Sequence, residues 1–358
     1  MVGCRVGNPA LVSIIIPTFN RADCVSRTID SALGQTHANV EVLVIDDGST
    51  DATQAVVLDT FGNDPRVRYV HQKNAGVSAA RNHGIRLVQG EYAALLDSDD
   101  VWKAFKLELQ LACFDAFPDA GMVWSDMTAV DPKGAVLSKA YLRTFYSNYN
   151  VFTRDELFDR SLPLAEVAPG LAAEVGDRRA WGGEIYGPMI LGNLVHTSTV
   201  LLRRERLVAT GFFDESRRSG EDHEFHLRTC RAGRVAFIDV DTIDYQVGRP
   251  DALTQPRYGL DMAMNYLNTL TSTLERDRDR IKVPQHIIDK VLADGHAWVA
   301  ETLVAQGKHE EARPYLLYSL RQQPAQPRLV GMYTSTFLPS RVMKGLVGVY
   351  QKLKKRIP

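Results

Sequence analysis

Short apolar segments rich in β-branched residues alternate with helix-like segments through the first 125 residues, and this alternation restricts the fold more than any other feature. Strands that are each followed by a helix predict a parallel sheet with helices on both faces. The sequence therefore predicts an α/β fold of the Rossmann-like kind. The predicted strands are residues 11–16, 40–45, 66–70 and 92–96, and the predicted helices are residues 24–33, 50–60 and 77–88.

Polar residues follow the predicted strands at the points where they end. Asp46 and Asp47 follow the second strand, and Asp97 and Asp99 follow the fourth. Ligands of parallel sheets bind beyond the carboxyl ends of the strands, so these segments are the first candidates for a functional site. Asp97 and Asp99 also present the oxygen ligands that Mg²⁺ and Mn²⁺ prefer when the metal is shared with phosphate.

Each of these residues has an ordinary structural alternative. Aspartate is common in turns and at helix N-caps, so the aspartate pairs could form turns or cap a helix that begins near Val101. Arg81, in the third predicted helix, could be a solvated surface charge, although its guanidinium fork also suits a phosphate group. Taken singly, these residues leave both interpretations open.

Composition excludes several other classes of protein. The chain is 45% hydrophobic and 24% charged, which is typical of a globular protein and not of a disordered or fibrous one. Its four cysteines are scattered without a CxxC pair, so we expect free thiols and neither a zinc site nor a disulfide framework. The sequence contains no apolar run of transmembrane length, and its start lacks the apolar stretch of a secretory signal. The predicted location is therefore cytoplasmic.

Three regions differ in their sequence patterns. We expect an α/β domain over residues 1–255, a helical region over residues 256–335, and a separate tail over residues 336–358. The segments predicted beyond the first four strands are loops over residues 140–190, strands over 194–202 and 234–240, a helix over 221–230, and a helical hairpin of residues 286–305 and 309–322.

Four motifs occur in order after the successive strands. Their order and spacing resemble the family 2 glycosyltransferases, which are inverting enzymes with the GT-A fold, over about residues 10–245. The resemblance implies a Rossmann-like, mostly parallel sheet flanked by helices, followed in this chain by an α-helical C-terminal region. The motifs are Pro17-Thr18-Phe19-Asn20-Arg21, Asp46-Asp47-Gly48-Ser49-Thr50-Asp51, the segment from Asn74-Ala75-Gly76 to Arg81-Asn82-His83-Gly84, and Leu96-Asp97-Ser98-Asp99-Asp100.

The resemblance implies a binding site for a nucleotide-diphosphate sugar, with a UDP-sugar as the expected donor. Phe19 would stack on the base, and Asp47 would accept a hydrogen bond from its imide N–H. Arg81 would reach the diphosphate, and Asp97 would contact the ribose or the donor sugar. The other residues that the resemblance places in the donor site are Pro17, Thr18, Asn20, Asp46, Asn74, Gly76 and Ser98.

The same resemblance implies a metal ion and a catalytic base. Asp99 would bind Mn²⁺ or Mg²⁺, which neutralises charge on the departing nucleoside diphosphate. Asp222 would deprotonate the acceptor hydroxyl, because an inverting displacement needs one base opposite the leaving group. Glu221 would support this base or contact the acceptor. The structural alternative for Glu221 and Asp222 is that acidic residues are common in the first turn of a helix, where they interact favourably with the helix dipole. The same dipole lowers the basicity of a carboxylate.

Two further residues are candidates for contacts with the acceptor. His196 precedes an apolar segment similar to segments that line the acceptor cleft in the family, and a buried structural histidine is the alternative. Trp181 lies in a glycine-rich stretch and could stack on a sugar or pack in the core. Trp124, by contrast, is expected in the core.

The formal net charge of -1 conceals a basic C-terminus. Residues 312–358 contain nine basic residues and no acidic one, so the preceding residues carry a net charge of -10. This acidic body argues against a nucleic-acid partner. Apolar residues recur at helical spacing in the tail, which predicts a helix that lies on an anionic membrane surface or packs on protein. A place at the inner membrane face would suit a lipid-linked acceptor.

The predicted function is transfer of a sugar from a nucleotide-diphosphate sugar to a hydroxyl of a carbohydrate or lipid-linked acceptor. Processive synthases of the family carry a QxxRW motif, which residues 245–250 do not fit, so we expect transfer of one or a few sugars. A dinucleotide-dependent oxidoreductase is disfavoured because no GxGxxG follows the first strand. The remaining alternative is a non-catalytic scaffold that binds sugar or nucleotide and recruits partners through its helical C-terminus.

Overall fold

The chain divides into two compact units, Met1–Gln255 and Pro256–Pro358. The computed structural model describes residues 10–249 and 255–338. Most of the predicted tail, from residue 339 on, lies outside the described residues, so its membrane or protein contacts stay a prediction.

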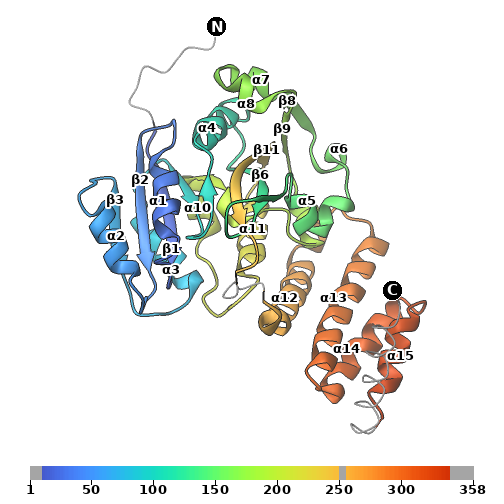
Figure 1. The fold of residues 1–358 in the computed structure, drawn as a ribbon. Coiled ribbons are helices and arrows are strands. Elements are labelled where there is room, and N and C mark those ends of the chain that lie inside the picture. The colour runs from blue at the N-terminus through green and yellow to red at the C-terminus, as the bar shows by residue number, and fades with distance from the viewer. Residues whose placement is uncertain (1–9, 250–254, 339–358) are drawn as a thin grey trace. The chain divides into compact units, whose positions relative to one another are not determined.

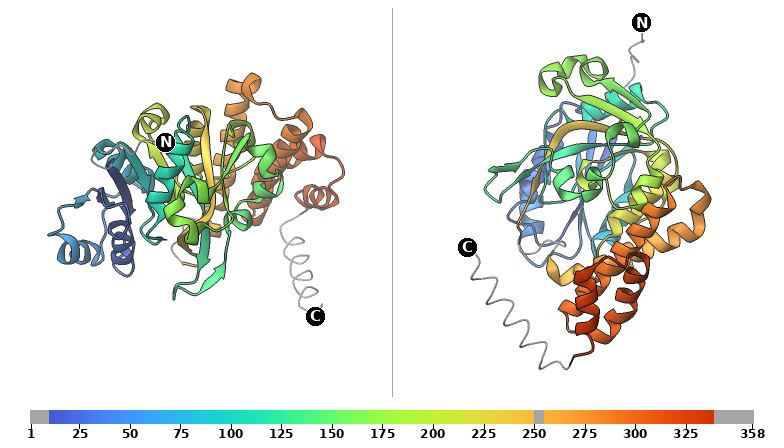
Figure 2. Two further views of the ribbon diagram at one scale, coloured as in Figure 1. Left: turned by 90° about the horizontal axis from the view of Figure 1, so that it is seen from above. Right: turned by 90° about the vertical axis from the view of Figure 1, so that its right-hand side faces the viewer.

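The first unit begins with the predicted alternation of strands and helices. Central strand β1 (Val12–Thr18) pairs in parallel with both β2 and β4, and β2 pairs in parallel with β3. Helices lie on both faces of this sheet (Figures 1 and 2), which confirms the predicted fold class. The other elements here are β2 (Val40–Asp46), β3 (Val67–His71), β4 (Tyr92–Leu95), α1 (Val25–Leu33), α2 (Thr53–Phe61) and α3 (Val77–Leu87).

The sheet continues past β4 in the order β3-β2-β1-β4-β10-β6-β11-β9-β8. Because β10 is antiparallel to both β4 and β6, and β11 is parallel to β6, the long strands β6 and β11 run in the same direction as β1 to β4. The strands added here are β5 (Val101–Trp102), β6 (Met122–Val130), β7 (Val136–Ser138), β8 (Arg160–Pro163), β9 (Arg179–Gly183), β10 (Leu201–Arg203) and β11 (Val235–Gln246).

The prediction of loops over residues 140–190 was wrong for much of this segment, which contains strands β8 and β9 and several short helices. Gly182 and Gly183 end β9 and do not mark a turn. A side chain at Gly182 would place its Cβ 2.4 Å from the Phe117 ring, so glycine is needed here for close packing. The helices from α4 to α11 are α4 (Lys106–Ala116), α5 (Leu142–Phe145), α6 (Arg154–Leu157), α7 (Leu164–Val167), α8 (Ala172–Val175), α9 (Tyr186–Ile190), α10 (Arg204–Thr210) and α11 (Glu221–Arg231).

Two other expectations need correction. The strand predicted over residues 194–202 is formed by Leu201–Arg203 alone, and Thr197–Thr199 is a turn of 3₁₀ helix. The Ser198 hydroxyl in this turn accepts a hydrogen bond from the Asp97 backbone N–H, so side-chain chemistry competes with strand pairing. The helix considered near Val101 begins at Lys106 instead, because Val101 pairs with β11 in strand β5.

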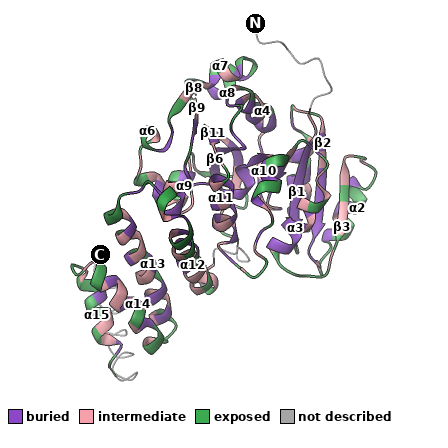
Figure 3. Ribbon diagram, turned by 180° about the vertical axis from the view of Figure 1, so that it is seen from behind, coloured by how far each residue is buried: buried purple, intermediate pink, exposed green. Residues whose placement is uncertain are grey.

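The core of the first unit lies along its central strands. Every residue of β1 and β6 is buried, as Figure 3 shows by the purple of these strands. Trp124 on β6 is fully buried against Phe158 and Phe237, which confirms its expected core position. Strands covered on both faces give continuous apolar sequence, and this explains why the strand predictions succeeded there.

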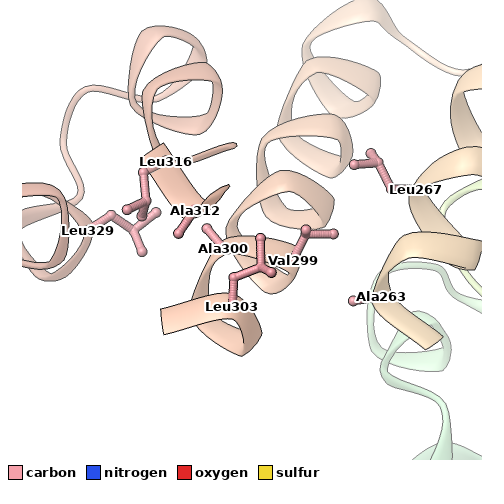
Figure 4. Close-up of a cluster of buried hydrophobic side chains, with 8 residues drawn as sticks. All are labelled: Ala263, Leu267, Val299, Ala300, Leu303, Ala312, Leu316 and Leu329. Atoms are coloured by element: carbon pink, nitrogen blue, oxygen red, sulfur yellow. The ribbon is translucent and has the colours of Figure 1, made fainter. Parts of the chain in front are cut away.

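The second unit consists of the helices α12 (Gly259–Asp277), α13 (Gln285–Ala305), α14 (His309–Gln322) and α15 (Pro327–Ser335). The predicted hairpin of α13 and α14 is confirmed, and Gly307 in its turn has a φ of 78°, which favours glycine. An apolar cluster, drawn in Figure 4, packs residues of all four helices together. Among the residues that the structure describes, no helix has both the length and the apolar character needed to span a bilayer.

Candidate active site

The candidate site lies at the carboxyl ends of strands β1, β2 and β4. Because these strands are parallel, the predicted residues that follow them reach the same edge of the sheet. The amino end of α11 joins this edge through Glu221, which contacts Arg81 of α3. Residues that are far apart in sequence therefore meet at one place.

Arg81 is the centre of this arrangement. Its Nη2 donates a 2.8 Å hydrogen bond to Asp97 Oδ1, and its Nη1 donates a 2.8 Å hydrogen bond to Glu221 Oε1. The side chain lies over the ring of Phe213 and is only 4% exposed, so the alternative of a solvated surface charge was wrong. Burial opposes the charge of Arg81, but Asp97 and Glu221 outweigh it and raise the guanidinium pKa. The arginine is therefore a permanent cation inside the protein.

The two acids at the start of α11 differ in their surroundings. Glu221 is buried and bound to Arg81, whereas Asp222 is partly exposed and accepts a 3.1 Å hydrogen bond from Asn193 Nδ2. Burial raises the pKa of Asp222 and outweighs the opposing effects of backbone N–H groups and Arg81. The expected loss of basicity at a helix N-terminus is thus exceeded by desolvation, and Asp222 is the more accessible base of the pair.

The loop after β2 is held together by its two aspartates. Asp46 accepts hydrogen bonds from the Ser49 backbone N–H and the Tyr69 hydroxyl. The Asp47 carboxylate accepts hydrogen bonds from the backbone N–H groups of Ala75 and Gly76, at 2.9 and 2.8 Å. Asp47 therefore connects the loop after β2 to the loop before α3. A contact between Asp47 and a nucleotide base stays a prediction.

The segment after β1 presents an aromatic ring to solvent. Phe19 is 43% exposed although it directly follows the buried strand β1. Its neighbour Asn20 has a φ of 53° and accepts a 2.8 Å hydrogen bond from the Thr50 backbone N–H, which fixes this turn. The remaining donor-site candidates support the same edge: Pro17 and Thr18 end β1, Asn74 donates to the Asp47 carbonyl oxygen, Gly76 precedes α3, and the Ser98 carbonyl accepts from Thr28.

Comparisons with known proteins find a family match in the part of the chain that carries most of these residues. The family described as Glycosyl transferase family 2 matches residues 13–166, which include all of β1 but its first residue, the whole of β2 to β4, and the loops just described. Chondroitin synthase of Escherichia coli is 37% identical over 147 residues, which are 41% of this chain and 21% of that protein. Residues 13–166 form a family 2 glycosyltransferase domain. The matched segment covers only about a fifth of the length of that synthase.

Solved structures of other proteins have a similar fold over nearly the whole chain. Residues 1–349 of Staphylococcus aureus TarS in complex with UDP-GlcNAc superpose with a TM-score of 0.52 at 18% identity, over 91% of this chain and 90% of that one. A mannosyltransferase from Pyrobaculum calidifontis, in complex with GDP-Man and Mn²⁺, gives a TM-score of 0.50 at 16% identity, over 92% and 88% of the two chains. The fold is therefore GT-A.

Asp99 of the family 2 domain faces two arginines. Its Oδ2 lies 3.9 Å from Arg21 Nη2 and 3.7 Å from Arg249 Nε. Burial, with Asp97 nearby, raises the pKa of Asp99. Within residues 10–249 and 255–338, no three histidine, cysteine, aspartate or glutamate side chains gather to hold a metal ion. A site in which the protein supplies only one or two carboxylate oxygens nevertheless fits a Mg²⁺ or Mn²⁺ ion that takes its other ligands from substrate phosphates.

His196 lies close to Arg81 and Asp97, which both act on it electrostatically. It is buried, its ring contacts the edges of Phe145 and Tyr245, and its Nδ1 has no hydrogen-bond partner among the described residues. Burial lowers the pKa of His196 to about 4, against the opposite effect of Asp97. The imidazole is therefore neutral at neutral pH and can serve as a hydrogen-bonding group without charge.

Trp181 is not brought to the Arg81 centre by any described contact. It lies in β9, where it pairs with Phe237 of β11, and its ring packs near Arg154, Phe158 and Arg179. These contacts favour the core-packing alternative. A role of Trp181 in acceptor binding stays a prediction.

Sequence reasoning missed several residues of the site. Arg21 belongs to the first motif and could have been found from its place after Phe19. Arg249 lies in the segment that was compared with QxxRW and dismissed, yet its guanidinium reaches Asp99. Asn193 and Tyr146, which are linked to Asp222, carry no motif and could be found only from the folded structure.

Proposed function

We propose that the protein transfers a sugar from a nucleotide-diphosphate sugar to a hydroxyl group of a carbohydrate acceptor, with inversion at the anomeric carbon. The observation that carries the proposal is the position of Arg81 between Asp97 and Glu221, with Asp222 one residue further along α11. A buried cation for the diphosphate and an accessible base for the acceptor thus lie at one sheet edge.

The donor is bound by residues that follow the parallel strands. Phe19, exposed after β1, stacks on the base, and Arg81 contacts the diphosphate once its carboxylate partners share it with the ligand. Asp97 contacts the ribose or the donor sugar. A UDP-sugar is the first candidate, because TarS, similar in fold, is complexed with UDP-GlcNAc. The mannosyltransferase complex with GDP-Man makes a GDP-sugar the second candidate.

The reaction is a single displacement. The acceptor oxygen forms a bond to the anomeric carbon as the bond from that carbon to the diphosphate oxygen breaks, and the electron pair leaves with the nucleoside diphosphate. The acceptor proton passes to the Asp222 carboxylate, whose basicity is maintained by burial. Arg81 supplies fixed positive charge near the diphosphate. Mn²⁺ or Mg²⁺ held by Asp99 would neutralise further charge on the leaving group.

The acceptor approaches the accessible side of Asp222. His196 is neutral, and its Nδ1, which has no hydrogen-bond partner among the described residues, is free to form a hydrogen bond with the acceptor. The charges of Arg81 and Asp97 act on the His196 ring, so the ring lies next to the groups proposed to contact the donor. The chondroitin synthase relative supports a carbohydrate acceptor. A lipid-linked acceptor at the inner membrane face is a further proposal that depends on the C-terminal tail.

The test combines donor binding with turnover. UDP- and GDP-sugars are screened by thermal shift with and without Mn²⁺, and the donor that binds is then used to assay Asp222→Asn. The control is Glu224→Gln, because Glu224 lies on the same helix and pairs with Arg228. We expect Asp222→Asn to keep the donor shift and to lose turnover by a factor of about 10²–10⁴.

Two results would contradict the proposal. Full turnover by Asp222→Asn would reject Asp222 as the base. If a nucleotide sugar shifted the melting temperature but none were turned over by the unchanged protein, the scaffold alternative would be favoured.

A further inference from the structure

We propose that Asn193 is the positioning residue that holds the carboxylate of Asp222 in place for proton transfer, within a hydrogen-bonded frame completed by Tyr146. This inference rests on the proposed function, because it concerns the base of that reaction. Asn193 lies between α9 and the 3₁₀ turn Thr197–Thr199, and its distance from Asp222 is 29 residues in sequence.

The hydrogen bonds of Asn193 fix the orientation of its amide. The Val195 backbone N–H donates to Asn193 Oδ1 at 3.0 Å, so the oxygen faces the backbone. The Nδ2 group must therefore face the other way, where it donates to Asp222 Oδ2 at 3.1 Å and to the Tyr146 hydroxyl at 3.3 Å. Both hydrogens of the amide are used, and the orientation follows from the network.

Tyr146 closes the frame. Its hydroxyl accepts from Asn193 and donates to the Val195 carbonyl oxygen at 3.4 Å. Tyr149, on the same short segment as Tyr146, donates to the Leu194 carbonyl oxygen at 2.7 Å. The backbone that carries Asn193 is thus tied on two sides to residues 146–149. A donor held in this way can select one orientation of a carboxylate that would otherwise rotate about its χ2 angle.

The backbone before Asn193 requires glycine. Gly192 has a φ of 149°, and a Cβ at this position would lie 2.5 Å from Asn148 Nδ2. The close approach brings the segment that carries Asn193 against the residues that carry Tyr146. The frame is therefore a consequence of tertiary packing and not of a local turn signal.

The charged groups around Asp222 come from three directions. Arg81 on α3 and Asp97 after β4 act on it electrostatically in opposite senses, and its own backbone N–H and that of His223 lower its pKa. Glu221 is the adjacent acid on α11, and its carboxylate is paired with the Arg81 guanidinium. Burial, with the charge of Asp222 nearby, raises the pKa of the Tyr146 hydroxyl, which therefore stays protonated. Asn193 is the neutral side chain that donates directly to the carboxylate.

Asn193 therefore acts on the ionised form of Asp222. A hydrogen bond to a carboxylate favours its charged state, and it also restricts the directions from which the acceptor hydroxyl can approach. Loss of this donor is expected to lower kcat and to move the acid side of the pH profile upward. The donor-binding residues are unaffected, so KM for the donor stays the same.

The experiment uses the full chain with the donor identified by thermal shift. Turnover by Asn193→Ala, Asn193→Asp and Tyr146→Phe is measured as kcat and donor KM over a range of pH. Asn193→Asp keeps the shape of the side chain while it replaces the donor by a second carboxylate, so it serves if the alanine variant does not fold. Asn150→Ala, at an exposed position on the neighbouring segment, is the matched control.

We expect kcat of Asn193→Ala to fall by about tenfold, while the donor KM stays within about twofold of that of the unchanged protein. The reason is that part of the rate enhancement by a general base depends on its correct orientation. The acid limb should move to higher pH in Asn193→Ala and further in Asn193→Asp, where like charges oppose ionisation. Tyr146→Phe should show a smaller loss, since the direct bond from Asn193 remains.

An unchanged pH profile and kcat in both Asn193 variants would overturn the inference. The result is separable from failure of the proposed function. If Asp222→Asn is inactive but the Asn193 variants behave like the unchanged protein, Asp222 is the base and Asn193 does not position it. If Asp222→Asn is fully active, the proposed base itself is rejected.

Discussion

The two units of the chain are stabilised by different kinds of interior. In residues 10–249, ionisable side chains are buried with the sheet, and Arg81, Glu221, Asp100, Asp126 and Lys106 are all nearly inaccessible. In residues 255–338, the described core is an apolar cluster, and Asp277 is the one buried ionisable side chain that the structure describes there. Buried charges cost free energy unless they are paired, so their concentration in one unit indicates function more than stability.

The largest expected effect comes from breaking the charge centre of the first unit. Arg81→Met leaves Asp97 and Glu221 without their shared cation, and we expect a loss of about 3–5 kcal/mol in the free energy of unfolding together with loss of donor binding. Urea denaturation and donor thermal shift measure the two effects. Arg86→Met on the same helix is the control, because Arg86 is half exposed and contacts Glu215 only at 4.0 Å. If Arg81→Met had the stability and donor affinity of the unchanged protein, the buried charges of the first unit would not have the functional role proposed for them.

The corresponding change in the second unit removes apolar contacts without charge. Leu316 is fully buried in the cluster of Figure 4, so Leu316→Ala should destabilise the second unit by about 2–5 kcal/mol. Donor affinity, measured by titration at a temperature where the variant is folded, should be unchanged, because the donor residues belong to the first unit. Val330→Ala, at an exposed position of α15, is the control. A loss of donor binding in Leu316→Ala at a temperature where it is folded would contradict the separation.

The buried acid Asp126 predicts a pH dependence of the first unit. Burial raises the pKa of Asp126 to about 6, while its Oδ1 accepts from the Met127 and Leu142 backbone N–H groups. An acid with a raised pKa contributes stability that is complete below its unfolded pKa and is lost as pH rises through about 6. Asp126→Asn does not titrate, so it should become more stable than the unchanged protein by about 2 kcal/mol between pH 4 and pH 7.

This prediction is checked by urea denaturation at several pH values. Asp59→Asn, at an exposed position of α2, is the control. A stability difference for Asp126→Asn that does not grow with pH would show that its carboxyl is not held neutral by burial.

The smallest effect is expected at the surface of the first unit. Phe19 is exposed, so Phe19→Ala should change the free energy of unfolding by less than about 0.5 kcal/mol. Donor affinity should fall by about 1–2 kcal/mol if the ring stacks on the base, since stacking of a base on an aromatic side chain contributes on this scale. Donor titration by thermal shift measures the loss, and Phe19→Tyr should restore it. Unchanged affinity in Phe19→Ala would place the base elsewhere.

The sequence determined the first four strands, the helices between them, the hairpin of α13 and α14, and the family of residues 13–166. Buried parallel strands and amphipathic helices leave their periods in the sequence, and the polar residues after β1, β2 and β4 stand where a ligand site is expected. Residues 140–190 were misjudged because glycines that permit close packing, such as Gly182, look the same in sequence as glycines in turns.

Only the tertiary structure decided which of the polar residues meet. Arg81 and Glu221 are 140 residues apart, and no local pattern could show that they form one buried ion pair. The distinction between Glu221 and Asp222 also comes from packing, since adjacent acids have similar sequence signals but differ here in exposure and in partners. Asn193 reaches Asp222 because separate segments pack at one sheet edge, and contacts of this kind leave no periodicity in the sequence.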